Sequence, residues 1–141
     1  MFDLNEIYHS NKHIEMPQWA KDMVNELCQM YDKPRPDICW LESGTDGYTG
    51  GWYAHDTNEI VVVADGNFRT DSHSLAHEFA HYVTNEGHTS TMYMELFNIV
   101  ERLGISRNYM ISIEWDYQPT RFASALMKRQ ARERYPTDHC R

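Results

Sequence analysis

Apolar residues recur with a helical period near the start of the chain. Between Pro17 and about Tyr31 they fall at i, i+4, i+8 and i+11, which places four of them on one helix face: Trp19, Met23, Leu27 and Met30. Proline is favoured in the first turn of a helix, whereas Pro34 and Pro36 prevent its continuation. The pattern therefore predicts a helix that buries one apolar face.

Three segments with the pattern of strands come next. Residues 37–42 form one, and residues 52–55 and 60–64 form a hairpin across the polar turn at 56–59. The segment 60–64 reads Ile-Val-Val-Val-Ala and is apolar throughout, which predicts a strand that is buried on both faces. A glycine-rich connection at 43–51 precedes the hairpin.

The second half of the chain is predominantly helical by the same criteria. The expected elements are a helix to about Thr84 with Thr70 or Asp71 as its N-cap, a helix at 90–103 ended by Gly104, a short strand at 110–115 and a helix at 119–135. One helix, three strands and then further helices predict an α+β fold rather than alternating α/β. We expect a small antiparallel or mixed three-stranded sheet packed on the helix that ends near Thr84.

Length and charge narrow the class of protein. The chain has 141 residues, 41% of them hydrophobic, so we expect residues 1–141 to form one globular domain. No apolar run approaches the roughly 20 residues of a membrane span. The start lacks the features of a signal peptide, and three cysteines without a CxxC motif are typical of a reducing compartment, so we expect a cytoplasmic protein.

The net charge of −8 is unevenly distributed. Residues 121–141 hold six Lys or Arg against two acidic residues, an excess of four positive charges. An acidic body disfavours nucleic acid, but the basic helix expected at 119–135 offers a possible local DNA contact. A solvated helix face, or pairing with the acidic body, is the simpler explanation of these charges.

A five-residue motif carries the strongest chemical signal. His77 and His81 are four residues apart, so their imidazoles lie on one helix face and can bind one Zn²⁺. Glu78 would project beside the metal, where it can take a proton from metal-bound water. The flanking residues of LAHEFAHYV are apolar, which predicts a buried helix, and buried charge costs free energy unless it is paired or metal-bound.

A catalytic zinc ion usually takes a third protein ligand and leaves the fourth position to water. His88 stands seven residues after His81 in a polar stretch, and Gly87 would let the chain turn its imidazole toward the metal. Glu95, in the following helix, is the alternative third ligand, and Glu86 is a weaker one. The spacing differs from HExxHxxGxxH, in which the third His comes six residues after the second.

The stretch HEFAHYVTNEGHTSTMYMELFNIVERLGI resembles the core of the SprT-like zinc metallopeptidases, in which HExxH is followed by a loop, a third His and a helix. The family commonly has a GHGPxF-like sequence at the third His. This chain keeps Gly87 and His88, but has Thr89 and Ser90 where Gly-Pro is usual. The resemblance covers about residues 50–103. It implies a zincin-like fold, three zinc ligands and a catalytic carboxylate: His77, His81, His88 and Glu78.

These residues favour a zinc-dependent peptidase that acts on a protein or peptide substrate. Glu78 would be the general base, and the developing oxyanion needs a further donor, for which the candidates are Tyr109, Tyr117, Arg107 and Arg121. Residues 51–54 would form an edge strand that either pairs with an extended substrate or is an ordinary amphipathic edge strand with its aromatic residues in the core. Two other functions stay open: a non-catalytic, zinc-stabilised binding module and a DNA-associated regulatory protein.

Overall fold

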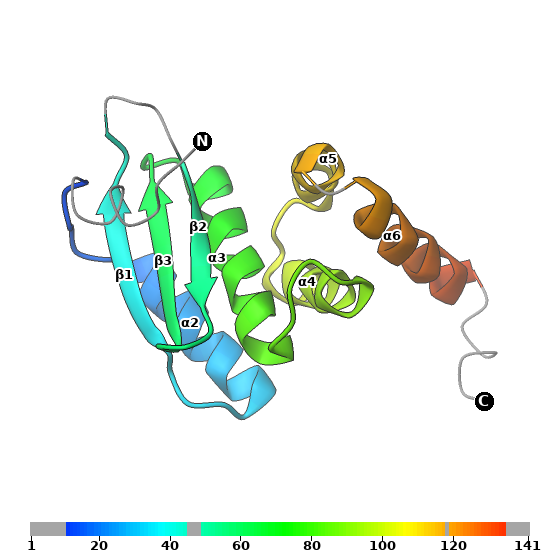
Figure 1. The fold of residues 1–141 in the computed structure, drawn as a ribbon, viewed down its shortest axis with the longest axis horizontal. Helices are drawn as coiled ribbons and strands as arrows, with labels where there is room; N and C mark the ends of the chain where they lie inside the picture. The colour runs from blue at the N-terminus through cyan, green and yellow to red at the C-terminus, as the bar shows by residue number, and fades with distance from the viewer. Residues whose placement is uncertain (1–10, 45–48, 118, 135–141) are drawn as a thin grey trace.

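The computed structural model describes residues 11–44, 49–117 and 119–134. A three-stranded sheet lies on one side of the molecule, α2 and α3 pack against it, and α4, α5 and α6 extend the helical part beyond α3 (Figure 1). The elements are α2 (Gln18–Tyr31), β1 (Asp37–Glu42), β2 (Gly50–Ala54), β3 (Glu59–Ala64), α3 (Phe68–Thr84), α4 (Ser90–Leu103), α5 (Arg107–Tyr117) and α6 (Pro119–Arg134). This arrangement confirms the α+β class.

The sheet is mixed and has the order β1-β3-β2. β1 runs parallel to β3, with Asp37 opposite Glu59, and β2 runs antiparallel to β3, with Gly51 opposite Val62. Residues 12–14 make backbone hydrogen bonds to the outer side of β1. Among the described residues no strand pairs with the outer edge of β2.

Burial of β3 on both faces confirms the prediction from its unbroken apolar sequence. Ile60 and Val62 face the main core with helix residues such as Leu75 and Phe79. On the opposite face, Val61 belongs to a smaller cluster that also contains Cys39, Leu41 and Val63. Only one face of the sheet, the face that carries Ile60 and Val62, packs against α3.

The start of α3 differs from the prediction of Thr70 or Asp71 as its N-cap. The helix begins at Phe68, and the side chain of Asn67 accepts hydrogen bonds from the backbone N–H groups of Arg69 and Thr70. Asp71 instead accepts from the N–H groups of Asp65 and Gly66, at 3.1 and 3.0 Å. Asn67 caps the helix because it lies directly before the first helical residue, in the turn that follows β3. Asp71 connects this turn to the first turn of the helix through its two hydrogen bonds.

The strand predicted at 110–115 is wrong, because this segment belongs to α5. Met110 and Glu114 are the buried positions, with 0% and 1% of their surface exposed. Their spacing of four residues is helical, and the Ser106 hydroxyl accepts from the N–H of Tyr109 in the first turn. Burial of Met110 and the hydrogen bonds of Glu114 to His73 and His77 outweigh the strand propensity of the local β-branched residues.

β2 begins at Gly50, two residues before the predicted strand, so it includes glycines that the sequence placed in a connection.

No described helix is both long and apolar enough to cross a bilayer.

Gly51 tests how tightly β2 packs on α3. A Cβ at this position would lie 2.5 Å from the carbonyl oxygen of Val61 and 3.2 Å from Cγ of Glu78. Because the carbonyl is backbone, Gly51→Ala should lower the free energy of unfolding by about 1–3 kcal/mol in urea denaturation. Gly87→Ala is the matched control, since nothing lies within 4 Å of its added Cβ. Equal stability of the two variants would contradict this packing.

Candidate metal centre

Helix α3 is enclosed over most of its length. Every residue from Asp71 to Tyr82 is buried, because the sheet covers one side of the helix and α4 packs on another. His77, Glu78 and His81 have exposed fractions of only 8%, 5% and 7%. The ionisable residues of the predicted motif therefore lie inside the protein, where an unpaired charge is costly.

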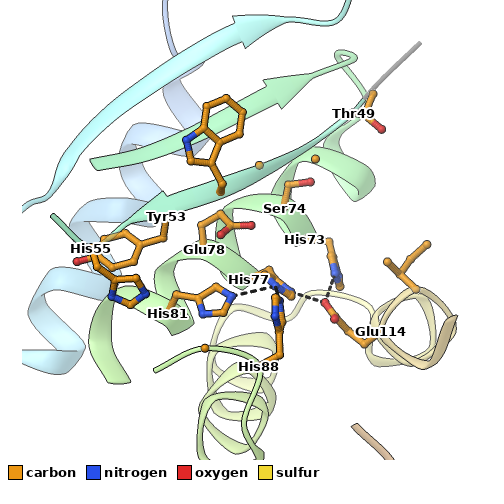
Figure 2. A pocket seen from close by; sticks show the side chains of 15 residues that line it. Thr49, Tyr53, His55, His73, Ser74, His77, Glu78, His81, His88 and Glu114 are labelled. Carbon is orange, nitrogen blue, oxygen red and sulfur yellow. Dashed lines mark hydrogen bonds and ion pairs between the residues drawn. The ribbon is translucent and has the colours of Figure 1, made fainter. Parts of the chain in front are cut away.

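Three imidazoles meet through their Nε2 atoms. His77 Nε2 lies 3.3 Å from that of His81, one helical turn away, and 3.2 Å from that of His88 in the α3–α4 connection (Figure 2). The connection is held by the α4 N-cap Thr89, whose hydroxyl bonds to the Glu86 carboxylate and accepts from the Met92 N–H. The structure thus brings together the three histidines predicted from the sequence.

The remaining ring nitrogens set the tautomers of two of these histidines. His77 Nδ1 lies 2.6 Å from Oε2 of Glu114, and His81 Nδ1 lies 2.7 Å from the backbone carbonyl of Glu86. Carbonyl and ionised carboxylate oxygens only accept, so both Nδ1 atoms donate. In the neutral rings the two facing Nε2 atoms then carry lone pairs, which repel one another unless a cation lies between them.

The spacing of the Nε2 atoms fits a common metal ion. Tetrahedral ligands at 2.0–2.1 Å from zinc stand about 3.3–3.4 Å apart, close to the separations of 3.2 and 3.3 Å. All three atoms lie within 4.8 Å of one another. This triad could hold one ion and leave a position open toward the cavity.

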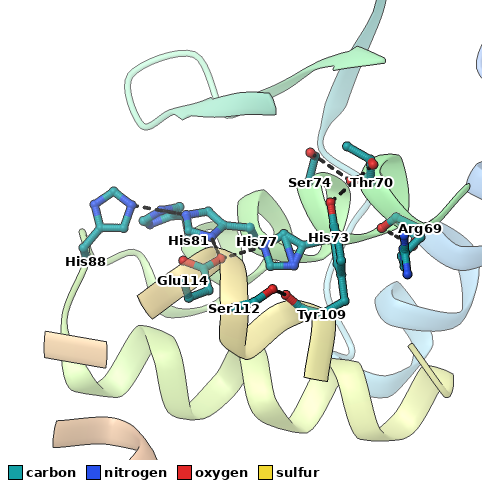
Figure 3. Close-up of polar contacts among 11 residues, drawn as sticks. Arg69, Thr70, His73, Ser74, His77, His81, His88, Tyr109, Ser112 and Glu114 are labelled. Atoms are coloured by element: carbon teal, nitrogen blue, oxygen red, sulfur yellow. Dashed lines mark hydrogen bonds and ion pairs between the residues drawn. The ribbon is translucent and has the colours of Figure 1, made fainter. Parts of the chain in front are cut away.

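A second group of possible ligands adjoins the first. Oε2 of Glu114 lies 2.7 Å from His73 Nε2 as well as 2.6 Å from His77 Nδ1 (Figure 3). These are hydrogen-bond lengths, and they are too short for two ligands of one tetrahedral ion. The group is therefore a hydrogen-bonded chain from His73 through Glu114 to His77.

This chain leaves two buried polar atoms unpaired. Nδ1 of His73 and Oε1 of Glu114 have no hydrogen-bond partner within the part of the chain that the structure describes. An unsatisfied buried polar atom costs about 1–3 kcal/mol. A carboxylate and an imidazole are thus kept in the interior at an energetic cost.

Glu78 faces the cavity from the same helix turn. The cavity has a volume of about 530 Å³ and is lined by α3, the connection with His88, α5 and β2. Burial raises the pKa of Glu78 to about 7, and the charge of Glu114 adds to this while that of His77 opposes it. A carboxyl group with this pKa can both accept and release a proton near neutral pH.

Burial also shifts the pKa values of the histidines. It lowers the pKa of His73 and of His81 to about 4, and it lowers that of His88. Burial acts in the same direction on His77, but the charge of Glu78 and the hydrogen bond and charge of Glu114 outweigh it, so this pKa is raised. The surroundings favour a positive charge at His77, whether from a proton or a metal ion.

The carboxylates of the other predicted ligands, Glu95 and Glu86, are not part of the cavity wall. Glu95 accepts a hydrogen bond from the hydroxyl of Tyr31 and another from the side-chain amide of Asn98. It is not among the cavity residues, so α4 directs it elsewhere. Glu86 contributes its backbone carbonyl to His81.

Of the predicted oxyanion donors, Tyr109, Arg107 and Arg121 are not part of the cavity wall. The Tyr109 hydroxyl bonds to Thr70, the Arg107 guanidinium lies over the ring of Phe97, and Arg121 donates to the backbone carbonyl of His88. The side chain of Tyr117 lies outside the described part of α5. Arg121 therefore supports the third histidine through the backbone.

Sequence reasoning missed His73 and Glu114. His73 precedes His77 by four residues, as His77 precedes His81, so the spacing itself was a signal that all three share one helix face. Glu114 had no such signal, because a strand was predicted where α5 lies. Its partners are 37 and 41 residues away in sequence.

No family model matches the chain, and neither a curated protein nor a solved structure does. The resemblance to the SprT-like peptidases accordingly stays a prediction.

Two variants of the metal-free protein test the burial of Glu78 and His81. The two changes should alter the pH dependence of the free energy of unfolding in opposite directions. The raised pKa of Glu78 means that the native state binds its proton more tightly than the unfolded chain between about pH 4.5 and 7. Wild type should gain stability relative to Glu78→Gln as the pH falls through this range. For His81, with a pKa of about 4, the unfolded chain binds the extra proton, so wild type should lose stability relative to His81→Asn between about pH 6.5 and 4.

Urea unfolding in a chelator at several pH values measures both differences. Asn at position 81 can keep the bond to the Glu86 carbonyl through its side-chain amide, which makes the comparison one of titration. Parallel pH profiles for the wild type and both variants would show that these groups are not buried as described.

Proposed function

We propose that the protein is a zinc-dependent peptidase, with His77, His81 and His88 as the metal ligands. The observation that carries this proposal is that Nε2 of His77 lies 3.2 Å from that of His88 and 3.3 Å from that of His81, beside the buried carboxylate of Glu78 in a cavity. Nitrogen ligands and tetrahedral spacing are typical of zinc. A purely structural site would not need Glu78 beside it.

When bound, zinc would lower the pKa of a water molecule and polarise the peptide carbonyl. Glu78 would accept a proton from that water as the oxygen attacks the carbonyl carbon, and would pass it to the amine as the C–N bond breaks. In the metal-free protein, burial raises the pKa of this carboxyl group to about 7. Glycine at position 51 leaves room for the carboxylate, because a Cβ there would lie 3.2 Å from Cγ and 3.5 Å from Oε2 of Glu78.

The substrate would lie in extended form along β2. The cavity wall includes Thr49 to Tyr53, and the outer edge of this strand has no partner among the described strands. Backbone hydrogen bonds to β2 would hold a peptide above the three histidines with little dependence on its sequence. The two glycines of β2 leave room for its backbone.

DNA binding has less support. The described basic residues of α6 contact the protein itself: Arg129 pairs with Glu101 and donates to Asn98, and Lys128 donates to Ser90. These contacts favour the structural explanation of the basic helix.

Zinc binding distinguishes the two candidates for the third ligand. His88→Ala should weaken zinc affinity by more than the roughly 10–100-fold that follows loss of an outer-shell partner. Glu95→Gln should leave the affinity unchanged. Competition with a chromophoric chelator measures both, and the reverse result would make Glu95 the ligand.

Glu78→Gln tests catalysis. The variant should keep zinc but cleave an unfolded protein such as labelled casein about 10²–10⁴-fold more slowly, because the amide cannot act as a general base. Glu95→Gln is again the matched control and should retain full activity. Zinc-loaded Glu78→Gln cleaving at the wild-type rate would exclude the mechanism.

Removal of zinc separates an enzyme from a zinc-stabilised binding module. In the catalytic case a chelator abolishes cleavage and leaves the far-ultraviolet circular dichroism spectrum largely intact. In the structural case the fold itself is lost.

A further inference from the structure

We propose that Glu114 is a positioning residue for the metal ligand His77, and that His73 holds Glu114 in place. The proposal rests on the proposed metal site, but its geometry lies outside the three ligands. The chain of hydrogen bonds crosses from α3 to α5 and is almost wholly shielded from solvent, with exposed fractions of 5% for His73 and 1% for Glu114.

First, the hydrogen bond from His77 to Glu114 fixes the tautomer of His77. Its ring can bind a metal through Nε2 only if Nε2 carries no proton. Oε2 of Glu114 lies 2.6 Å from Nδ1 of His77 and accepts a hydrogen bond from the Nδ1–H group. The proton therefore stays on Nδ1, and the lone pair of Nε2 faces His81 and His88. An acceptor at this position orients the ring and raises its basicity.

The second step concerns His73. A single hydrogen bond would leave the Glu114 carboxylate free to rotate about its side chain. Nε2 of His73 donates to the same Oε2 at 2.7 Å, so two donors from successive turns of α3 converge on one oxygen. The ring of His73 is itself held by edge contact with Tyr109, with the centroids 5.7 Å apart.

The third step is the energetic cost. Both His73 Nδ1 and Glu114 Oε1 are buried and have no hydrogen-bond partner among the residues that the structure describes. Apolar side chains of similar volume at positions 73 and 114 would give the fold equal or greater stability. Their presence is explained if a fixed acceptor behind His77 is needed. Helix α5 is then a part of the metal site, although it supplies no ligand.

The first test reads the tautomer without metal. In a chelator, at a pH where the rings are neutral, long-range ¹H–¹⁵N spectra should show the proton of His77 on Nδ1 in wild type. Glu114→Gln should move the tautomer population toward Nε2–H, since a neutral amide oxygen is a weaker acceptor than a carboxylate and the NH₂ group can take the place of Oε2. Glu95→Gln, the same change on α4, should leave the His77 signals unchanged.

The second test measures zinc affinity by chelator competition. Glu114→Gln should bind zinc about 10–100-fold more weakly than wild type, and His73→Phe should show a smaller loss in the same direction. His73→Gln, which keeps a donor, should recover part of that loss. His73→Phe also serves if Glu114→Gln does not fold, as judged by circular dichroism.

The outcomes separate this proposal from the proposed function. If wild type binds zinc and the Glu114 and His73 variants match it in affinity and tautomer, the positioning role is overturned and the peptidase proposal stands. If wild type binds no zinc, the peptidase proposal fails, and the tautomer spectra still decide whether Glu114 sets the proton of His77. A loss of stability with unchanged tautomer and affinity would show a structural role only.

Discussion

The candidate site depends on one electrostatic constraint, which is that three imidazole nitrogens face one another inside the protein. Two of them carry lone pairs, because the opposite nitrogens of His77 and His81 donate to Glu114 and to the carbonyl of Glu86. Such an arrangement favours a cation at its centre. The raised pKa of His77 expresses the same preference in the metal-free protein, and the lowered pKa values of His81 and His88 show that burial resists further protons.

The fold meets this constraint by enclosing α3 from several directions. β3 and the core beneath it hold the apolar side of the helix, while Gly51 lets β2 approach Glu78 closely. The α3–α4 connection presents His88 and the Glu86 carbonyl, and Arg121 of α6 donates to the backbone of His88. Each of these elements contacts Glu78 or one of the candidate ligands, so the candidate site depends on β2, the α3–α4 connection and α6 as well as on α3.

The hydrogen-bonded chain behind His77 gives α5 a role that its position in the sequence does not suggest. Glu114 receives two hydrogen bonds from α3, and Tyr109 in the preceding turn contacts both His73 and Thr70. The cavity is bounded by β2 on one side and by α5, which carries the fixed acceptor Glu114, on another. A rigid acceptor behind a candidate ligand is what the proposed metal site would require.

Local patterns were enough for the sequence to determine α2, the three strands, α4 and the helix that carries His77, Glu78 and His81, because apolar periodicity and the four-residue spacing are properties of neighbouring residues. It also indicated His88. Only the tertiary structure decided that β1 and β3 are parallel, that Glu95 turns to Tyr31, and that 110–115 is helical with Glu114 directed at His73 and His77. These features depend on partners far apart along the chain, whose packing overrides local propensity.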